Sequence, residues 1–277
     1  MSAREGKYMY CIIECEVPKN FGPIGVGGRG DELTTVSYQR LSAVVSNSPV
    51  IEYRVTRENT MTHQSAIETV MKEYPVLPIR FSTIAETEEE IVEKVLKPRY
   101  EEFKTLLAWI SNKKELGLKV YWQEMKAILN EIVEGNETIK SFKEEIQKRS
   151  PQQAYYDQIE IGKMIEKELN EKREKEGEFL IKPLKELAED SKVHATYIPE
   201  LIVSAAFLVK KTMELQFDLA VNRIQEDFPG RHRINYVGEA PPVNFVNIVI
   251  HWDRPALSQS PSDPKVRGKE AQNVSPR

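Results

Sequence analysis

The chain of 277 residues has 39 Lys and Arg against 43 Asp and Glu, which gives a formal net charge of −4. This balance provides no basic surface for nucleic acid or an anionic membrane, and the longest apolar run, 201–209, is far shorter than the roughly 20 residues that span a bilayer. We therefore expect a soluble cytoplasmic protein without a signal peptide or membrane anchor, with about two domains by its length.

Residues 1–113 predict an α+β domain. The pattern Thr87-Glu88-Glu89-Glu90 favours a helix start, because the Thr side chain caps free N–H groups and the acids complement the helix dipole. Pro98 is expected to interrupt that helix. The expected elements are strands at 7–15, 34–38, 41–46 and 75–81, and helices at 59–74, from 87 onward and up to about 112.

The two cysteines and a glycine-rich segment each raise one question of chemistry. Cys11 and Cys15 share the first expected strand, roughly 13 Å apart and too far for a disulfide, so buried reduced thiols are expected.

Residues 25–30 match G-x-G-x-x-G, and Glu52 follows at the spacing of a ribose contact. However, the strand ends near Cys15 and another strand follows the glycines, which favours a flexible loop over a nucleotide site.

Residues 114–252 predict a second α+β domain. Strand, helix, strand, helix, strand is the order of a ferredoxin-like domain whose first crossover is elaborated by extra helices, and 194–198 is expected to supply the remaining strand. The charged run 166–178 is interpreted as a solvated helix or arm, with a charged binding surface as the alternative. The other expected elements are strands at 116–122, 201–209 and 231–237, a helical region at 123–190 and a helix at 213–228.

Two segments near the C-terminus contain prolines but differ in their apolar content. Pro241-Pro242 with Asn244 and Phe245 predicts a rigid turn that seats the following segment, and a binding groove is the alternative. Residues 253–277 have almost no large apolar side chain, so they cannot bury enough surface to offset the entropy of ordering. A disordered tail is expected there.

His63 and Arg80 are the residues for which a functional and a structural interpretation compete. His63 lies on the apolar face of helix 59–74, where a histidine is either a packed side chain or a general base. Arg80 follows the proline-bounded segment Pro75 to Ile79 and precedes Phe81. Its side chain forms either a buried ion pair or aromatic stack, or an anchor for a partner's carboxylate.

Six short segments, in order along the chain, share motifs with one known family. They are Tyr8-Met9-Tyr10-Cys11-Ile12-Ile13, Leu41-Ser42-Ala43-Val44-Val45-Ser46, Pro75-Val76-Leu77-Pro78-Ile79-Arg80-Phe81, Glu115-Leu116-Gly117-Leu118-Lys119-Val120-Tyr121, Ser204-Ala205-Ala206-Phe207-Leu208-Val209 and Gly238-Glu239-Ala240-Pro241-Pro242-Val243-Asn244-Phe245-Val246. Together they resemble the gas vesicle protein GvpF/GvpL family from about residue 7 to 249. The subtype, F or L, stays open.

The resemblance implies a gas vesicle assembly factor or minor structural component that is not an enzyme. It implies cytoplasmic contacts with the hydrophobic shell protein GvpA and with other accessory proteins, without cofactor or metal. The sequence contains no G-x-x-x-x-G-K-S/T, G-x-S-x-G or H-E-x-x-H motif. The alternative is a ligand-binding or hydrolytic α+β protein with a site near His63 and Arg80. The candidate partner-binding residues are Pro75, Pro78, Arg80, Phe81, Asn244 and Phe245.

Overall fold

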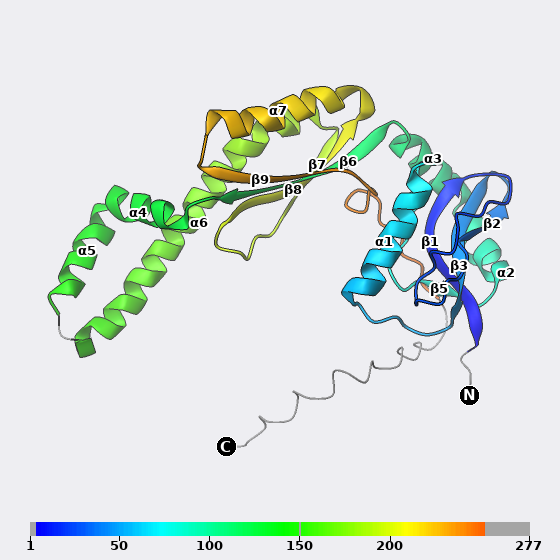
Figure 1. The fold of residues 1–277 in the computed structure, drawn as a ribbon, viewed down its shortest axis with the longest axis horizontal. Helices are drawn as coiled ribbons and strands as arrows, with labels where there is room; N and C mark the ends of the chain where they lie inside the picture. Colours follow the sequence, from blue (N-terminus) through cyan, green and yellow to red (C-terminus); the bar gives the residue numbers. More distant parts are fainter. Residues whose placement is uncertain (1–3, 150, 253–277) are drawn as a thin grey trace, which may run out of the picture. The chain divides into compact units, whose positions relative to one another are not determined.

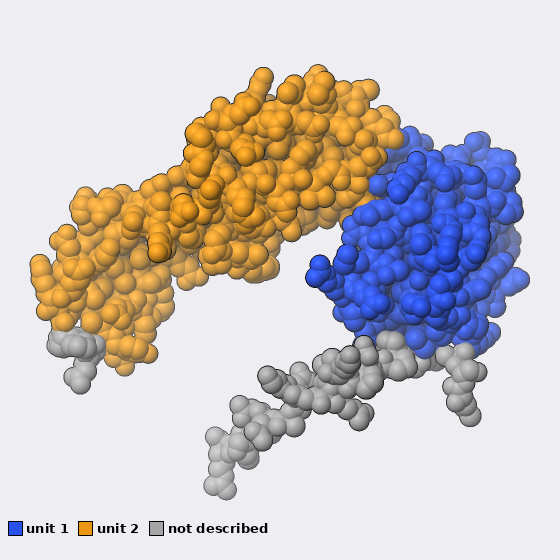
Figure 2. Space-filling view, in the orientation of Figure 1, with its two compact units in different colours: residues 1–111, 246–277 blue, residues 112–245 orange. Residues whose placement is uncertain are grey.

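A computed structural model describes residues 4–149 and 151–252 (Figure 1). They form two compact units, one of residues 1–111 with the chain from Val246 onward, and one of residues 112–245 (Figure 2). We call them unit 1 and unit 2. The chain therefore returns to unit 1 at its end, whereas a single crossing near 113 was expected. The predicted disordered tail, 253–277, lies outside the described residues.

Unit 1 is an antiparallel sheet with helices packed on it (Figure 1). The strand order is β2-β3-β1-β4, and β5 also pairs with β1. The strands are β1 (Glu5–Glu14), β2 (Thr34–Tyr38), β3 (Leu41–Pro49), β4 (Leu77–Pro78) and β5 (Ile84–Ala85). The helices are α1 (Arg57–Met71), α2 (Glu88–Ile91), the π-helical turn η1 (Val92–Leu96) and α3 (Tyr100–Ile110).

Local sequence signals account for the helix boundaries of unit 1. The Thr87 side chain accepts a hydrogen bond from the Glu90 N–H at 3.2 Å, so the predicted cap is confirmed. The break around Pro98 is also confirmed, since η1 ends at Leu96 and α3 begins at Tyr100. Helix α1 starts after the Thr56 cap and buries His63, Ala66, Ile67 and Val70 against the sheet.

The strand expected at 75–81 is only two residues long. Pro78 has no N–H to donate, and after Ile79 the chain leaves β1, to which it returns where the Met9 N–H donates to the Thr83 carbonyl at 2.9 Å. Ser82 has a φ of 64°, a left-handed conformation that an extended strand does not contain. The segment therefore forms a corner between β4 and β5.

Unit 2 has the predicted ferredoxin-like order, with the antiparallel sheet β7-β8-β6-β9. The strands are β6 (Lys113–Trp122), β7 (Asp190–His194), β8 (Leu201–Lys210) and β9 (His232–Ala240). The helices are α4 (Met125–Gly135), α5 (Glu137–Gln147), α6 (Pro151–Leu187), the short η2 (Lys211–Met213) and α7 (Glu214–Asp227). The elaborated crossover is thus α4, α5 and the long α6 (Figure 1).

Two expectations about unit 2 are wrong in detail. The remaining strand of the sheet is β7 at 190–194 and not 194–198, because residues 195–200 form the connection between β7 and β8. The charged run 166–178 is not simply solvated, since Leu169 and Gly177 are buried and Glu176 forms ion pairs within the unit. One face of the sheet packs on α6 and α7 through an apolar core that includes Leu118, Phe207, Leu180 and Phe217.

Candidate partner-binding site

The corner at residues 79–83, here called the Arg80 corner, is held by hydrogen bonds on both sides. The Ser82 N–H donates to the Tyr8 hydroxyl at 2.9 Å, and the Ser82 hydroxyl accepts from the Tyr53 N–H at 2.9 Å. The Thr83 hydroxyl donates to the Arg80 carbonyl at 2.6 Å. These bonds stabilise the left-handed Ser82 and give the corner one defined conformation.

His63 packs beneath this corner inside an aromatic cluster. Its ring stacks on Tyr10 with centroids 5.6 Å apart, and its edge meets Phe81 at 5.6 Å. Nδ1 lies 3.1 Å from the Tyr8 hydroxyl, and the side chain is buried. Burial lowers the pKa of His63 to about 4, although a hydrogen bond with the Ile79 backbone opposes the shift. The imidazole is therefore a neutral packing group.

The glycine-rich segment packs on the same cluster and does not form a nucleotide site. The Val26 N–H donates to the Tyr10 hydroxyl at 2.8 Å, and β2 rather than a helix follows the glycines. A Cβ added at Gly27, whose φ is 100°, would lie 2.9 Å from the Tyr53 hydroxyl. The loop expected to be flexible is therefore packed against the core.

The side chain of Arg80 does not form the buried ion pair or the aromatic stack that the structural interpretation predicted. Its side chain is exposed, and within residues 4–149 and 151–252 it has no hydrogen-bond, ion-pair or ring partner. Only its backbone is engaged, where the N–H donates to the Ile248 carbonyl at 3.2 Å. The corner thus presents one free guanidinium, and the half-buried Phe81 is the next residue along the chain.

The outer edge of β4 is covered by the chain's own returning segment. Ile79 forms a parallel bridge with Ile248, and Arg99 Nη1 donates to the Val249 carbonyl at 3.3 Å. Val246 and Ile248 are 3% and 2% exposed. An added partner strand at 75–81 would have to displace this segment, so the edge is not open for strand addition.

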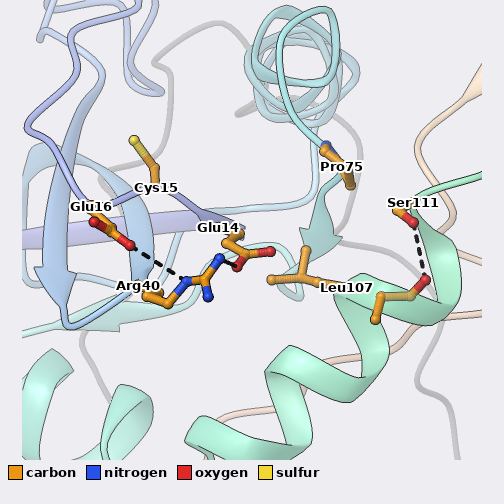
Figure 3. Close-up of a pocket in the computed structure, with 8 residues that line it drawn as sticks. Glu14, Cys15, Glu16, Arg40, Pro75, Leu107 and Ser111 are labelled. Carbon is orange, nitrogen blue, oxygen red and sulfur yellow. Dashed lines mark hydrogen bonds and ion pairs between the residues drawn. The ribbon is translucent and has the colours of Figure 1, made fainter.

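Unit 1 also contains a cavity of about 420 Å³, and Pro75 is one of the residues that line it (Figure 3). Among the other lining residues, Arg40 forms ion pairs with Glu14 at 2.8 Å and Glu16 at 3.4 Å, and Leu107 is apolar (Figure 3). The Cys15 thiol donates to the Val17 carbonyl at 3.2 Å. Cys11 and Cys15 are free and buried, as predicted, and burial raises the pKa of the Cys11 thiol.

The predicted residues Asn244 and Phe245 lie in unit 2, not at the Arg80 corner. The Asn244 backbone N–H and Nδ2 donate to the Glu115 carboxylate at 3.0 and 2.6 Å, and the Phe245 ring lies 5.8 Å from Lys192 Nζ. Burial raises the pKa of Glu115 despite the two Asn244 bonds. The Phe245 N–H also donates to the Pro242 carbonyl at 3.1 Å. Residues 242–245 therefore form a turn that is held against β6 by Glu115.

One polar network was not foreseen from the sequence. Glu176 accepts from Trp122 Nε1 at 3.1 Å and Arg231 Nε at 3.0 Å, and lies 2.6 Å from His232 Nε2. Arg231 also pairs with Glu131 at 2.8 Å. Burial alone would raise the pKa of Glu176, but hydrogen bonds from His232 and Arg231 lower it to about 2. The only sequence signal for this network was that Glu176 precedes Gly177 within the charged run 166–178.

The described part of the chain holds no group of three His, Cys, Asp or Glu placed to bind a metal ion. None of its described helices is both long enough and apolar enough to cross a membrane.

Comparison with known proteins gives concordant results. A model of the family described as gas vesicle synthesis protein GvpL/GvpF matches residues 6–247. Gas vesicle protein F of Dolichospermum flosaquae is 26% identical over 199 residues, which cover 71% of this chain and 80% of that protein. Gas vesicle protein F1 of Halobacterium salinarum is 25% identical over 249 residues, which cover 89% and 95%.

Two solved structures share the fold. The crystal structure of the gas vesicle protein GvpF from an Anabaena species superposes with a TM-score of 0.75 at 23% identity, covering 88% of this chain and 99% of that one. The GvpF structure from Microcystis aeruginosa gives a TM-score of 0.69 at 23% identity, covering 87% and 98%.

Proposed function

This chain belongs to the gas vesicle synthesis protein GvpL/GvpF family, and from that premise we propose that it is an assembly factor or minor component that binds the shell protein GvpA. Its role is connected with gas vesicles, as for the F proteins that it resembles. The proposal adds the partner, the cytoplasmic location and the way in which the contact is made. Other vesicle accessory proteins are further proposed partners.

The physical need for such a factor comes from the shell. A subunit that keeps water out of a gas space must be strongly apolar, and before assembly its exposed surface would aggregate. A protein that covers this surface transiently would prevent aggregation. A contact of standard size, about 800 Å² on each partner, is small enough for a unit of this chain to provide.

The observation that supports this site most directly is the exposed Arg80, whose side chain has no partner in the described chain. An exposed guanidinium that is next in sequence to a half-buried aromatic residue suits a carboxylate flanked by apolar side chains. Val55, two residues after the Tyr53 that binds the corner, leaves 81% of its surface exposed and adds apolar area. We therefore assign GvpA contact to the side chains of Arg80 and Phe81, and not to the covered edge of β4.

A hydrolytic or ligand-binding role at His63 has less support. A general base must reach the proton that it removes, but this imidazole is buried against Tyr8, Tyr10 and Phe81. With its pKa lowered to about 4, it would also be a weak base.

The proposal is tested with Arg80→Ala and, as a matched control, Arg54→Ala, a change at another exposed arginine of unit 1. Each variant is co-expressed with GvpA, and the GvpA recovered with the purified chain is measured. Loss of a charge-assisted hydrogen bond of about 1.5–3 kcal/mol should reduce recovery at least roughly ten-fold for Arg80→Ala. Arg54→Ala should behave like the unchanged chain.

Thermal unfolding of both variants completes the test. Arg80 makes no side-chain contact among the described residues, so the melting temperature should stay within about 2 °C. Equal GvpA recovery from both variants would exclude the Arg80 corner as the contact. Absence of GvpA with the unchanged chain, together with normal vesicles in cells that lack it, would refute the assembly role itself.

A further inference from the structure

The sheet of unit 2 has one face that α6 and α7 do not cover. Its core side chains, such as Leu118, Val120 and Phe207, point toward those helices. Side chains alternate along a strand, so Gly117 and Lys119 lie on the opposite face, here called the open face. A cavity of about 390 Å³ lies on the open face.

A row of four polar side chains crosses the open face, one from each strand. Lys119 of β6 is in register with Ser204 of β8 and with Asn235 of β9, and Ser204 is in register with His194 of β7. All four line the cavity. Across the described chain none of these four side chains has a hydrogen bond or ion pair. Lys119, His194 and Asn235 are exposed and Ser204 is 8% exposed, so this row is accessible to a partner.

The adjacent row gives this cavity its depth. Gly117 is in register with Ala206 and Val237, so two of the central positions have almost no side chain. The nearest atom to a Cβ built on Gly117 would be 3.9 Å away, which leaves open space above the strand. A partner backbone or bulky side chain can therefore approach the sheet closely here.

The accessible charge around the polar row is positive. Lys119 and Arg233 are exposed, and Arg233 stacks on Tyr121 with its guanidinium 4.2 Å from the ring centroid. Lys192 lies one row away, in register with Ala206. The acids on this face are Glu115, which is 4% exposed and bound by Asn244, and Asp190 at the end of β7.

From this arrangement we propose that the open face binds an acidic helix of a partner protein. A sheet face is normally covered by a helix, as α6 and α7 cover the other face, whereas an extended segment pairs with a sheet edge. Glutamates of the helix meet Lys119, Lys192 and Arg233, while Ser204 and Asn235 supply hydrogen bonds. The side chains over Gly117 and Ala206 fill the cavity.

A nucleic acid is a poorer fit for this face than an acidic helix. Tight binding of nucleic acid rests on many neutralised phosphates, and three cations on a chain with a net charge of −4 provide few. A short helix that carries three or four acids matches the number of cations. This surface lies in unit 2, so the proposal does not depend on the Arg80 corner or on GvpA.

The probe is a fluorescent, lactam-stapled 20-residue peptide that is helical in solution, with glutamates and alanines along one face. The comparison peptide has lysine at each glutamate position. Fluorescence anisotropy is measured with the full chain, with Lys119→Glu and with the control Lys163→Glu, which changes an exposed lysine of α6 away from this face. We expect the acidic peptide to bind, and Lys119→Glu to weaken it at least roughly ten-fold with no effect of the control.

Several results of this experiment would contradict the proposal. Failure of the acidic peptide to bind, equal binding of the lysine peptide, or equal weakening by Lys163→Glu would each overturn the proposal. A single-stranded oligonucleotide that binds more tightly than the peptide, and is sensitive to Lys119→Glu, would replace the acidic helix with a nucleic acid. Lys119 has no intramolecular partner to lose, and an unchanged melting temperature verifies that Lys119→Glu is folded.

Discussion

The two units place their polar networks in different parts of the fold. In unit 1 the hydroxyls of Tyr8 and Tyr10 and the ring of His63 lie inside the core, where they hold the Arg80 corner and the glycine loop. In unit 2 the core beneath the helices is apolar, and the charged network of Glu176 and Arg231 lies beside it, joining α6 to the start of β9. Buried neutral groups therefore set loop conformation, while partly exposed charges fix a long helix on a sheet.

The largest expected effect comes from removing the returning segment of unit 1. Residues 1–111 alone should melt at least about 10 °C below 1–111 joined by a Gly/Ser linker to 246–252. Val246 and Ile248 are almost fully buried, and each contributes about 1.5–3 kcal/mol. Circular dichroism on heating measures the difference. Equal melting temperatures would show that the returning segment does not stabilise unit 1.

The next largest effect is expected at the charged network of unit 2. Glu176→Ala leaves Arg231, His232 and the Trp122 N–H without their shared acceptor, so the free energy of unfolding should fall by about 2–4 kcal/mol. Glu174→Ala, at an exposed position two residues earlier on α6, is the control and should cost less than about 0.5 kcal/mol. Urea denaturation measures both. A similar small loss in both would mean that the network does not hold α6.

The buried His63 of unit 1 should make the free energy of unfolding depend on pH. His63 has its pKa lowered to about 4 in the fold, against about 6.5 when unfolded, so between these values the unfolded chain binds a proton that the folded chain does not. The free energy of unfolding should therefore decrease by about 1–3 kcal/mol as the pH falls from 6.5 to 4. Glu176, with its pKa lowered to about 2, loses its contribution to the free energy of unfolding only when the pH falls below about 4.5.

His63→Gln isolates this contribution in urea titrations repeated across the pH range. The variant should cost about 1–2 kcal/mol at pH 7 through imperfect packing, and should flatten the curve between pH 6.5 and 4. An identical pH profile for the variant and the unchanged chain would assign the titration to other groups.

A smaller effect is expected from a single buried hydroxyl. Tyr10→Phe removes the acceptor of the Val26 N–H and the partner of Ser46 at 2.8 Å, and should cost about 1–2 kcal/mol. Hydrogen exchange at the Val26 amide should become faster as the glycine loop opens. Tyr38→Phe, at a partly exposed hydroxyl of the same unit, should change neither quantity.

The elements that followed from the sequence are those whose signal is local. β2 has the expected limits, β8 extends one residue beyond them, and the Thr87 cap depends on neighbouring residues alone. β7 was misplaced because its sequence, Asp190–His194, has a single apolar residue. A strand at the edge of a sheet needs little burial, so periodicity does not reveal it.

Candidate-site residues that are close in sequence also lie close together in the fold, whereas contacts between residues far apart in sequence were not foreseen. His63, Arg80 and Phe81 belong to one helix-to-strand unit, in which the rings of His63 and Phe81 are in contact and the side chain of Arg80 is exposed. Glu115 and Asn244 are 129 residues apart, and no local pattern predicts their pairing. The polar row of the open face depends on the register of four strands, which is set only when the whole sheet forms.

The bridge between Ile79 and Ile248 also sets an order of events during synthesis of the chain. Some 169 codons separate the two residues, and at roughly 5–20 residues per second translation of that interval takes about 8–34 s. During this time β4 has no neighbour on its outer side, although its proline limits pairing with other nascent chains. Unit 1 therefore cannot be completed until residue 248 has been synthesised, and a ribosome that stalls before codon 248 leaves β4 with an unprotected edge.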